Sequence, residues 1–169
     1  MIESAMRCTI ITGNRDAGKT RTAAHLAARL REDGARVGGI VSEARIEDGV
    51  KVGYSYVDLA TGRRAEYARR KTAPPAPGEL AFDLLDEGVA FGCSAIRAAV
   101  LSGADALFVD EIGPLEMGGG GLWPAVLESM RTFNGRVILT VRPSLAEELR
   151  ARVQSLAENV QIVEAGDGS

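Results

Sequence analysis

Short apolar runs alternate with helical patterns along most of the chain. Five runs rich in β-branched or other apolar residues have the length of strands: 7–12 (RCTIIT), 36–42 (RVGGIVS), 104–110 (ADALFVD), 136–141 (RVILTV) and 159–164 (NVQIVE). Continuous apolar runs of this length are typical of strands that are covered on both faces of a sheet. We therefore expect a central sheet that is buried between helices.

Helical patterns occupy the segments between these runs, over about 19–33, 87–102, 122–132 and 144–153. In the first of them apolar residues recur at helical spacing, and Gly34 follows as a helix stop signal. Because strands and helices alternate, the sequence predicts an α/β fold with a mostly parallel central sheet flanked by helices.

A different pattern interrupts this alternation between residues 50 and 69. Polar and apolar residues alternate in KVGYSYVDL, pause at 60–62 (ATG) and alternate again in RRAEYAR, which predicts an inserted antiparallel β-ribbon of two strands. Tyr54 and Tyr56 fall on one face of this ribbon, where we expect them to pack. The proline-rich segment 72–79 (TAPPAPGE) predicts a surface loop.

Composition narrows the class of protein. The chain has 169 residues, 46% of them hydrophobic, so one core suffices, and we expect a single domain over 1–165 with a disordered end at 166–169. The net charge of -3 gives no reason to expect nucleic acid as a partner. No apolar stretch is long enough for a membrane span, and Cys8 and Cys93 lack metal-ligand spacing. We expect a cytoplasmic protein with reduced thiols.

The stretch GNRDAGKT, residues 13–20, fits the phosphate-loop pattern G-x-x-x-x-G-K-[ST], with a predicted strand before it and a helix after it. Glycines let the backbone wrap round phosphates, and the amides at the helix start supply partial positive charge. Lys19 adds a full charge at the β and γ phosphates, and the Thr20 hydroxyl is a ligand for Mg²⁺. The residues predicted to bind nucleotide here are Gly13, Asn14, Arg15, Asp16, Ala17, Gly18, Lys19, Thr20 and Arg21.

Carboxylates end the third apolar run in ALFVDEIGPLEM, residues 106–117. In a phosphate-loop fold we expect this strand to lie beside the strand before the loop, with Asp110 meeting Mg²⁺ through water. Glu111 follows directly and is the candidate general base for water. Glu116 either reaches back to the nucleotide pocket or faces solvent. The glycines 118–121 predict a mobile loop, serving as linker or flap.

These motifs resemble a known family. VDEIGPLEM resembles the DEIGxME signature of the nucleoside-triphosphatase family first described from thermophiles, also known as the cancer-related nucleoside triphosphatase. GGIVSEARIEDGVKVGYSYVDLATGRRAEYAR and TVRP (140–143) are similar to that family's later segments. The resemblance implies a RecA-like P-loop fold and slow, broadly specific, Mg²⁺-dependent hydrolysis of nucleoside triphosphates. Asn14, Arg15 and Asp16 depart from the Pro-Pro-Gly usual in the family's loop.

For several charged residues the sequence leaves two interpretations open. The basic tract Arg63, Arg64, Arg69, Arg70 and Lys71 forms either a lid or partner contact, or a solvated edge strand protected by charge. Glu43 and Arg45 lie near the γ-phosphate or form a surface ion pair. Arg142 ends a strand on the nucleotide side and is a candidate for stacking on the base. His25, the single histidine, is expected to be an ordinary helix residue.

The sequence thus predicts a Mg²⁺-dependent enzyme that hydrolyses ATP, GTP and related nucleoside triphosphates to diphosphates. Lys19 and Glu111 are its candidate catalytic residues, and Thr20 and Asp110 are its metal ligands. Two alternatives stay open: a nucleoside or nucleotide kinase, and a nucleotide-gated adaptor with little turnover. A protein partner is not indicated, and the guanine-reading sequence Asn-Lys-x-Asp is absent.

Overall fold

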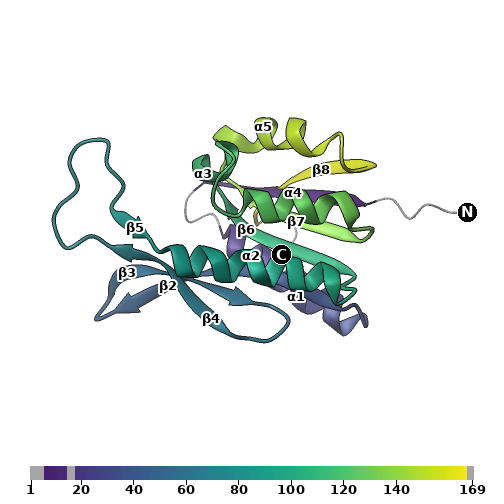
Figure 1. Cartoon of the computed structure of the whole chain (residues 1–169), viewed down its shortest axis with the longest axis horizontal. Helices are drawn as coiled ribbons and strands as arrows, with labels where there is room; N and C mark the ends of the chain where they lie inside the picture. Colours follow the sequence, from purple (N-terminus) through teal and green to yellow (C-terminus); the bar gives the residue numbers. More distant parts are fainter. Residues whose placement is uncertain (1–5, 15–17, 167–169) are drawn as a thin grey trace, which may run out of the picture.

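One sheet of eight strands runs through the described part of the chain, residues 6–14 and 18–166 of a computed structural model (Figure 1). In the order β5-β4-β3-β2-β6-β7-β1-β8, the last five strands are parallel, and β3, β4 and β5 are antiparallel to their neighbours. The strands are β1 Arg7–Thr12, β2 Val37–Glu47, β3 Val50–Asp58, β4 Arg64–Arg70, β5 Phe82–Leu84, β6 Ala106–Ile112, β7 Arg136–Val141 and β8 Asn159–Glu164.

Helices cover both faces of the parallel part, as predicted. Ala23 and Ala27 of α1 pack on one face, and α2, α4 and α5 pack on the other. Strand β6 shows why its apolar run is continuous, because Leu107 and Val109 enter one core and Ala106 and Phe108 enter the other. The helices are α1 Lys19–Glu32, α2 Asp86–Leu101, α3 Pro114–Met117, α4 Trp123–Thr132 and α5 Pro143–Val153.

The position of β6 corrects one expectation. We expected β6 to lie beside β1, but β7 pairs with both and lies between them. The strand that carries Asp110 is therefore two steps from the strand before the phosphate loop, and β7 places Thr140 between the two. The sequence held no signal for this order, because both strands have similar apolar runs.

The structure contains the predicted antiparallel ribbon, which is larger than predicted. Strands β3 and β4 pair as expected, and β2 continues past residue 42 to Glu47 and pairs with β3 through a tight turn at Asp48 and Gly49. The short strand β5 then pairs with β4. Figure 1 shows this antiparallel part extending away from the helix-covered sheet, with the long loop before β5 at its far end.

Glycines 118–121 form turns whose shape the structure explains. The N–H groups of Gly119 and Gly120 donate to the carbonyls of Glu116 and Leu115 in the short helix α3. A Cβ on Gly121 would lie 2.0 Å from Glu116 Oε2, so only glycine leaves room for that carboxylate. The mobility expected for this loop stays a prediction.

Candidate active site

Asp110 is the central buried carboxylate of the site. It is 1% exposed and lies near the end of β6. Its Oδ2 accepts hydrogen bonds from Thr20 Oγ1 at 2.6 Å and from the Ser42 amide at 2.8 Å, and its Oδ1 accepts one from Thr140 Oγ1. Burial raises the pKa of Asp110, while these hydrogen bonds act in the opposite direction. Three strands, β2, β6 and β7, and the helix α1 therefore converge on one carboxyl group.

Glu111 lies in a β-bulge. Val109 pairs with Leu139 and Ile112 pairs with Val141, so Asp110 and Glu111 together face one residue of β7. Glu111 adopts the left-handed region with φ 68°, and its N–H donates to Thr140 Oγ1 at 2.8 Å. Neighbouring residues of a regular strand point to opposite faces, so the bulge is what lets Asp110 meet Thr20 while Glu111 lines the adjoining cavity.

The phosphate loop is described at Gly13, Asn14 and from Gly18 onward; the predicted contacts of Arg15, Asp16 and Ala17 lie outside the described residues. Gly18 precedes α1 with φ 86°, a conformation that explains the glycine, and no side chain among the described residues caps this helix start. Its amides are thus available to an anion. Lys19 Nζ donates to the carbonyls of Gly13 at 2.8 Å and Asn14 at 3.3 Å, which holds the ammonium over the loop.

The donor set next to Lys19 fits Mg²⁺. The Thr20 hydroxyl and the Asp110 carboxylate supply hard oxygen ligands 2.6 Å apart. No cluster of three or more His, Cys, Asp or Glu suited to a metal occurs within residues 6–14 and 18–166. Mg²⁺ bound with a nucleotide needs only one or two protein oxygens, because phosphates and water complete its shell.

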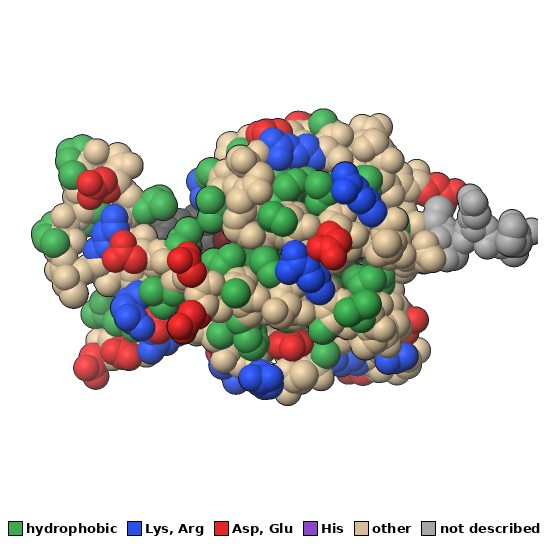
Figure 2. Space-filling view, viewed as in Figure 1, with side chains coloured by type: hydrophobic (Ala, Val, Ile, Leu, Met, Phe, Trp, Pro, Cys, Tyr) green, Lys and Arg blue, Asp and Glu red, His purple; other side chains and the backbone are tan. Residues whose placement is uncertain are grey.

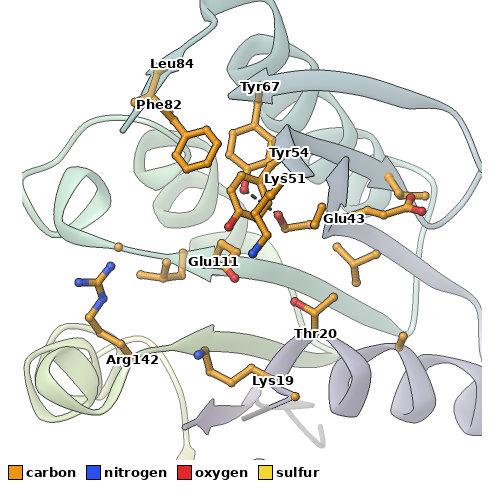
Figure 3. Close-up of a pocket in the computed structure, with 18 of the residues that line it drawn as sticks. Lys19, Thr20, Glu43, Lys51, Tyr54, Tyr67, Phe82, Leu84, Glu111 and Arg142 are labelled. Carbon is orange, nitrogen blue, oxygen red and sulfur yellow. Dashed lines mark hydrogen bonds between the residues drawn. The ribbon is translucent and has the colours of Figure 1, made fainter. Parts of the chain in front are cut away.

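Lys19, Thr20 and Glu111 line a cavity of about 1210 Å³ (Figure 3), with the buried Asp110 behind Thr20. Asn14, Gly18, Lys19 and Thr20 form one side of it, together with Glu111 and the exposed Arg142 that precedes α5. The exposed Arg21 and His25 of α1 are not among the described lining residues, although Arg21 was expected at the nucleotide.

A protein-family model described as NTPase matches residues 8–165, which is nearly the whole chain. The chain belongs to the NTPase family. Its relatives include nucleoside-triphosphatase THEP1 of Thermofilum pendens, 36% identical over 122 residues, and that of Methanothermobacter thermautotrophicus, 34% identical over 110 residues. The alignments cover 72% and 64% of this chain but only 66% and 61% of the relatives' lengths.

Solved structures support the P-loop fold of this NTPase-family chain. The solution structure of a human cancer-related nucleoside triphosphatase matches with a TM-score of 0.71 at 21% identity, covering 96% of this chain and 90% of that one. The crystal structure of THEP1 from the hyperthermophile Aquifex aeolicus matches with a TM-score of 0.68 at 19% identity, covering 95% and 90%. The predicted family and fold class are thus confirmed.

Glu116 corrects both interpretations offered for it. It neither reaches the cavity nor faces solvent, because it is 6% exposed and accepts hydrogen bonds from the amides of Gly113 and Leu122. Burial raises the pKa of Glu116, although these two hydrogen bonds act to lower it. The carboxylate joins the segment after Glu111 to the start of α4, a structural role that the NTPase signature alone did not reveal.

The basic tract forms ion pairs on the surface of the antiparallel part, where Figure 2 shows basic and acidic side chains interspersed. Strand β4 is not an edge over Ala68–Arg70, because β5 pairs with it, so the edge-strand interpretation is wrong there. Arg69 pairs with Glu66, and Lys71 lies 4.0 Å from Asp83. Arg63 and Arg70 are exposed.

Glu43 and Arg45 separate in the structure of this NTPase-family chain. Glu43 lines the cavity and forms an ion pair with Arg64 at 2.8 Å. Arg45 pairs with Glu66 and lines a smaller pocket of about 380 Å³ with Glu47.

Sequence reasoning missed part of the cavity wall. Ser42 and Thr140 stand near the carboxyl ends of predicted parallel strands, a position that could have singled them out. Lys51 and Phe82 also line the cavity, but their places depend on the inserted sheet, for which the sequence carried no register signal. Tyr56 packs as predicted, stacked on Tyr67 with ring centroids 3.7 Å apart.

Proposed function

We propose that this chain is a Mg²⁺-dependent nucleoside 5'-triphosphatase that releases nucleoside diphosphate and phosphate. The observation that carries the proposal is the convergence of Lys19, the Thr20–Asp110 contact at 2.6 Å and Glu111 on one cavity. Relatives at 36% and 34% identity bear the name nucleoside-triphosphatase, which supports the same activity here.

In this mechanism the chain holds the triphosphate at the start of α1. The amides after Gly18 and the Lys19 ammonium bind phosphate oxygens, and the phosphate charge draws Lys19 away from the carbonyls of Gly13 and Asn14. Thr20 and Asp110 would hold Mg²⁺, which would neutralise charge that develops on the phosphates. Ser42 donates to one oxygen of Asp110 and Thr140 to the other, which fixes the orientation of this carboxyl group.

Glu111 supplies the base. A water molecule beside its carboxylate attacks the γ-phosphorus in line with the bond to the β–γ bridging oxygen. That bond breaks with its electron pair on the diphosphate, and the water's proton passes to Glu111. The bulge fixes the backbone of Glu111 through its bond to Thr140, which keeps the base next to the group that holds the metal.

The decisive experiment measures Mg²⁺-dependent phosphate release from ATP, GTP, CTP and UTP and identifies the nucleotide product. Glu111→Gln should bind nucleotide with unchanged affinity and lose about 10²–10⁴-fold in turnover, the range for removal of a general base. Glu147→Gln, on the exposed face of α5, is the matched control and should behave as wild type. Equal turnover in Glu111→Gln would remove Glu111 from the mechanism.

The remaining sequence-based expectations belong to this proposal. We propose one domain over 1–165, nucleoside triphosphates of broad specificity as ligands, no nucleic acid partner, and a cytoplasmic location. Cys8 and Cys93 are free thiols, and burial raises the pKa of Cys8 to about 12, which makes this thiol unreactive. Within the described residues, no helix is both long and apolar enough to cross a bilayer.

A further inference from the structure

The cavity is larger than the phosphate site needs. Sites for single small molecules measure about 300–1,000 Å³, whereas this cavity measures about 1210 Å³. It runs along the sheet from the loop after β1 to strands β3, β4 and β5. At about 4.8 Å between neighbouring strands, β3 lies about 19 Å from β1, four steps away. The inserted sheet thus forms a separate end of the cavity.

Three aromatic rings line that end. We name the side chains Lys51, Tyr54, Tyr67 and Phe82 the distal wall; all four line the cavity, and Figure 3 shows them grouped opposite Lys19 and Thr20. The Tyr54 ring lies edge-on to Phe82, with centroids 5.4 Å apart, and 6.2 Å from Tyr67. Tyr54 and Phe82 are only half-buried, so part of their ring surface faces the cavity.

Lys51 adds a positive charge to this end of the cavity. Lys51 Nζ lies 5.3 Å from the centroid of the Tyr54 ring, and Figure 3 shows its ammonium pointing into the cavity. Lys51 forms no ion pair within residues 6–14 and 18–166, whereas the nearby Arg64 is neutralised by Glu43. An ammonium that forms no ion pair among the described residues, beside edge-on and tilted rings, favours an anionic group attached to a planar ring.

The nucleotide of the proposed reaction does not account for this wall. With its γ-phosphoryl group at Glu111 and Asp110, a triphosphate extends back along the phosphate loop, so its base lies on the side away from β3. This step rests on the proposed function. The distal wall is then beyond the γ-phosphate, where it meets Asp110 through a short chain of contacts: Tyr67 shares a hydrogen bond with Ser42 Oγ at 2.6 Å, and the Ser42 amide donates to Asp110.

We propose that the distal wall binds a second small molecule, a planar aromatic compound that carries an anionic group, while a nucleoside triphosphate occupies the phosphate loop. The rings supply flat apolar surface that is already ordered by contacts with one another, and Lys51 supplies the charge. Leu80 and Leu84, exposed at 72% and 46%, extend the apolar rim on the same side.

A binding experiment tests this without any need for hydrolysis. The fluorescent aromatic anion 8-anilinonaphthalene-1-sulfonate is titrated into the full chain, with and without saturating Mg²⁺ and adenylyl imidodiphosphate, a non-hydrolysable ATP analogue. The probe should bind with one-to-one stoichiometry in both conditions. Lys51→Gln should weaken its binding about tenfold and Tyr54→Leu about threefold to tenfold, from loss of the charge and of the ring contact.

Matched controls keep the outcomes distinct. Lys71→Gln removes the lysine directly after β4, which lines the smaller pocket instead, and Tyr54→Phe keeps the ring; both should bind the probe as wild type does. Displacement of the probe by the ATP analogue would place the base itself on the distal wall and overturn the proposal. Unchanged binding in Lys51→Gln and Tyr54→Leu would overturn it as well. A chain that binds the probe but hydrolyses nothing would instead refute only the proposed function.

Discussion

The two ends of the cavity are built by the two halves of one sheet, in different ways. At the phosphate end, parallel strands contribute groups from their carboxyl ends and following loops, such as Lys19, Asp110 and Thr140. At the distal end, the antiparallel strands contribute side chains from within the strands, such as Tyr54 and Tyr67. Parallel strands bring polar groups together at one edge, whereas antiparallel strands offer one continuous face.

The two ends also differ in backbone strain. Two non-glycine residues in the described chain have positive φ: Asp48, in the hairpin turn between β2 and β3, and Glu111 at the phosphate end. The turn requires such a conformation at Asp48, but the bulge at Glu111 is an interruption of a buried strand. Strain of about 1–3 kcal/mol is retained where function holds it in place. The phosphate end therefore gives up stability for geometry, and the distal wall does not.

Lys19→Ala should produce the largest effect, and it should abolish function at the phosphate end only. Loss of the ammonium removes the charge that meets the β and γ phosphates, so nucleotide affinity should fall at least about 100-fold and hydrolysis should vanish. Calorimetric titration with the ATP analogue measures the affinity. Probe binding at the distal wall should stay at the wild-type level, and a parallel loss of both would show that the two ends are not separate.

Gly88→Ala should disturb the distal wall, because the added methyl group clashes with strand β4. Gly88 lies in the first turn of α2, and a Cβ there would lie 2.0 Å from the Glu66 carbonyl and 2.4 Å from Tyr67 Cα. Because both atoms belong to the backbone of β4, the helix or the strand must move, at a cost of about 1–3 kcal/mol in the free energy of unfolding. Urea denaturation measures this loss.

Ser94→Ala, at an exposed position of the same helix, is the control for Gly88→Ala and should change stability by less than about 0.5 kcal/mol. The folded Gly88→Ala protein should bind the probe more weakly yet keep its affinity for the ATP analogue. Wild-type stability in Gly88→Ala would contradict the close approach of α2 to β4.

The same contrast explains how far the sequence could lead. Lys19, Thr20 and Asp110 were predicted because a local motif fixes the loop, and because a parallel strand delivers its last residue to a known edge. The place of Phe82 in the cavity could not be predicted from the sequence, because its three-residue strand is defined by pairing with β4 rather than by its own sequence pattern. The prediction for Glu116 was wrong for a related reason. Its hydrogen-bond donors are the backbone amides of Gly113 and Leu122, and every residue type except proline has such an amide, so the sequence does not single them out.

Tyr67→Phe should loosen the contact between the two ends while leaving the ring in place. The hydroxyl of Tyr67 and Ser42 Oγ share a buried hydrogen bond at 2.6 Å, so its removal should lower the free energy of unfolding by about 1–2 kcal/mol. Tyr54→Phe is the matched control, because no hydrogen bond of the Tyr54 hydroxyl is found among the described residues. Equal stability of the two variants would show that the Tyr67–Ser42 bond contributes nothing.

Glu111→Gly and Glu111→Ala together measure the strain at the phosphate end. Both remove the side chain and both should abolish turnover, but only glycine adopts φ 68° without cost. The relief of about 1–2 kcal/mol is partly offset by the greater freedom of glycine in the unfolded chain. Glu111→Gly should therefore be about 0.5–1 kcal/mol more stable than Glu111→Ala in urea denaturation. A more stable Ala variant would mean that the bulge holds no strain.

The smallest expected effect concerns the pH dependence of stability through Asp110. Burial raises the pKa of this carboxyl above the ordinary 3.8. A carboxyl whose pKa is higher in the folded than in the unfolded chain favours the folded state below the unfolded pKa, and this contribution is lost as pH rises through the folded pKa. Asn has no such proton to lose, and its amide can keep bonds to Ser42 and Thr140.

Asp110→Asn should accordingly become more stable relative to wild type as pH rises from about 4 to about 8, measured by urea denaturation without Mg²⁺ or nucleotide. The effect should be modest, because hydrogen bonds from Thr20, Ser42 and Thr140 already offset part of the burial. Glu147→Gln controls for the loss of one surface carboxylate. If the stability of Asp110→Asn relative to wild type fell as pH rises, the folded-state pKa of Asp110 would be lowered rather than raised. The phosphate end would then favour the ionised carboxylate even without a metal.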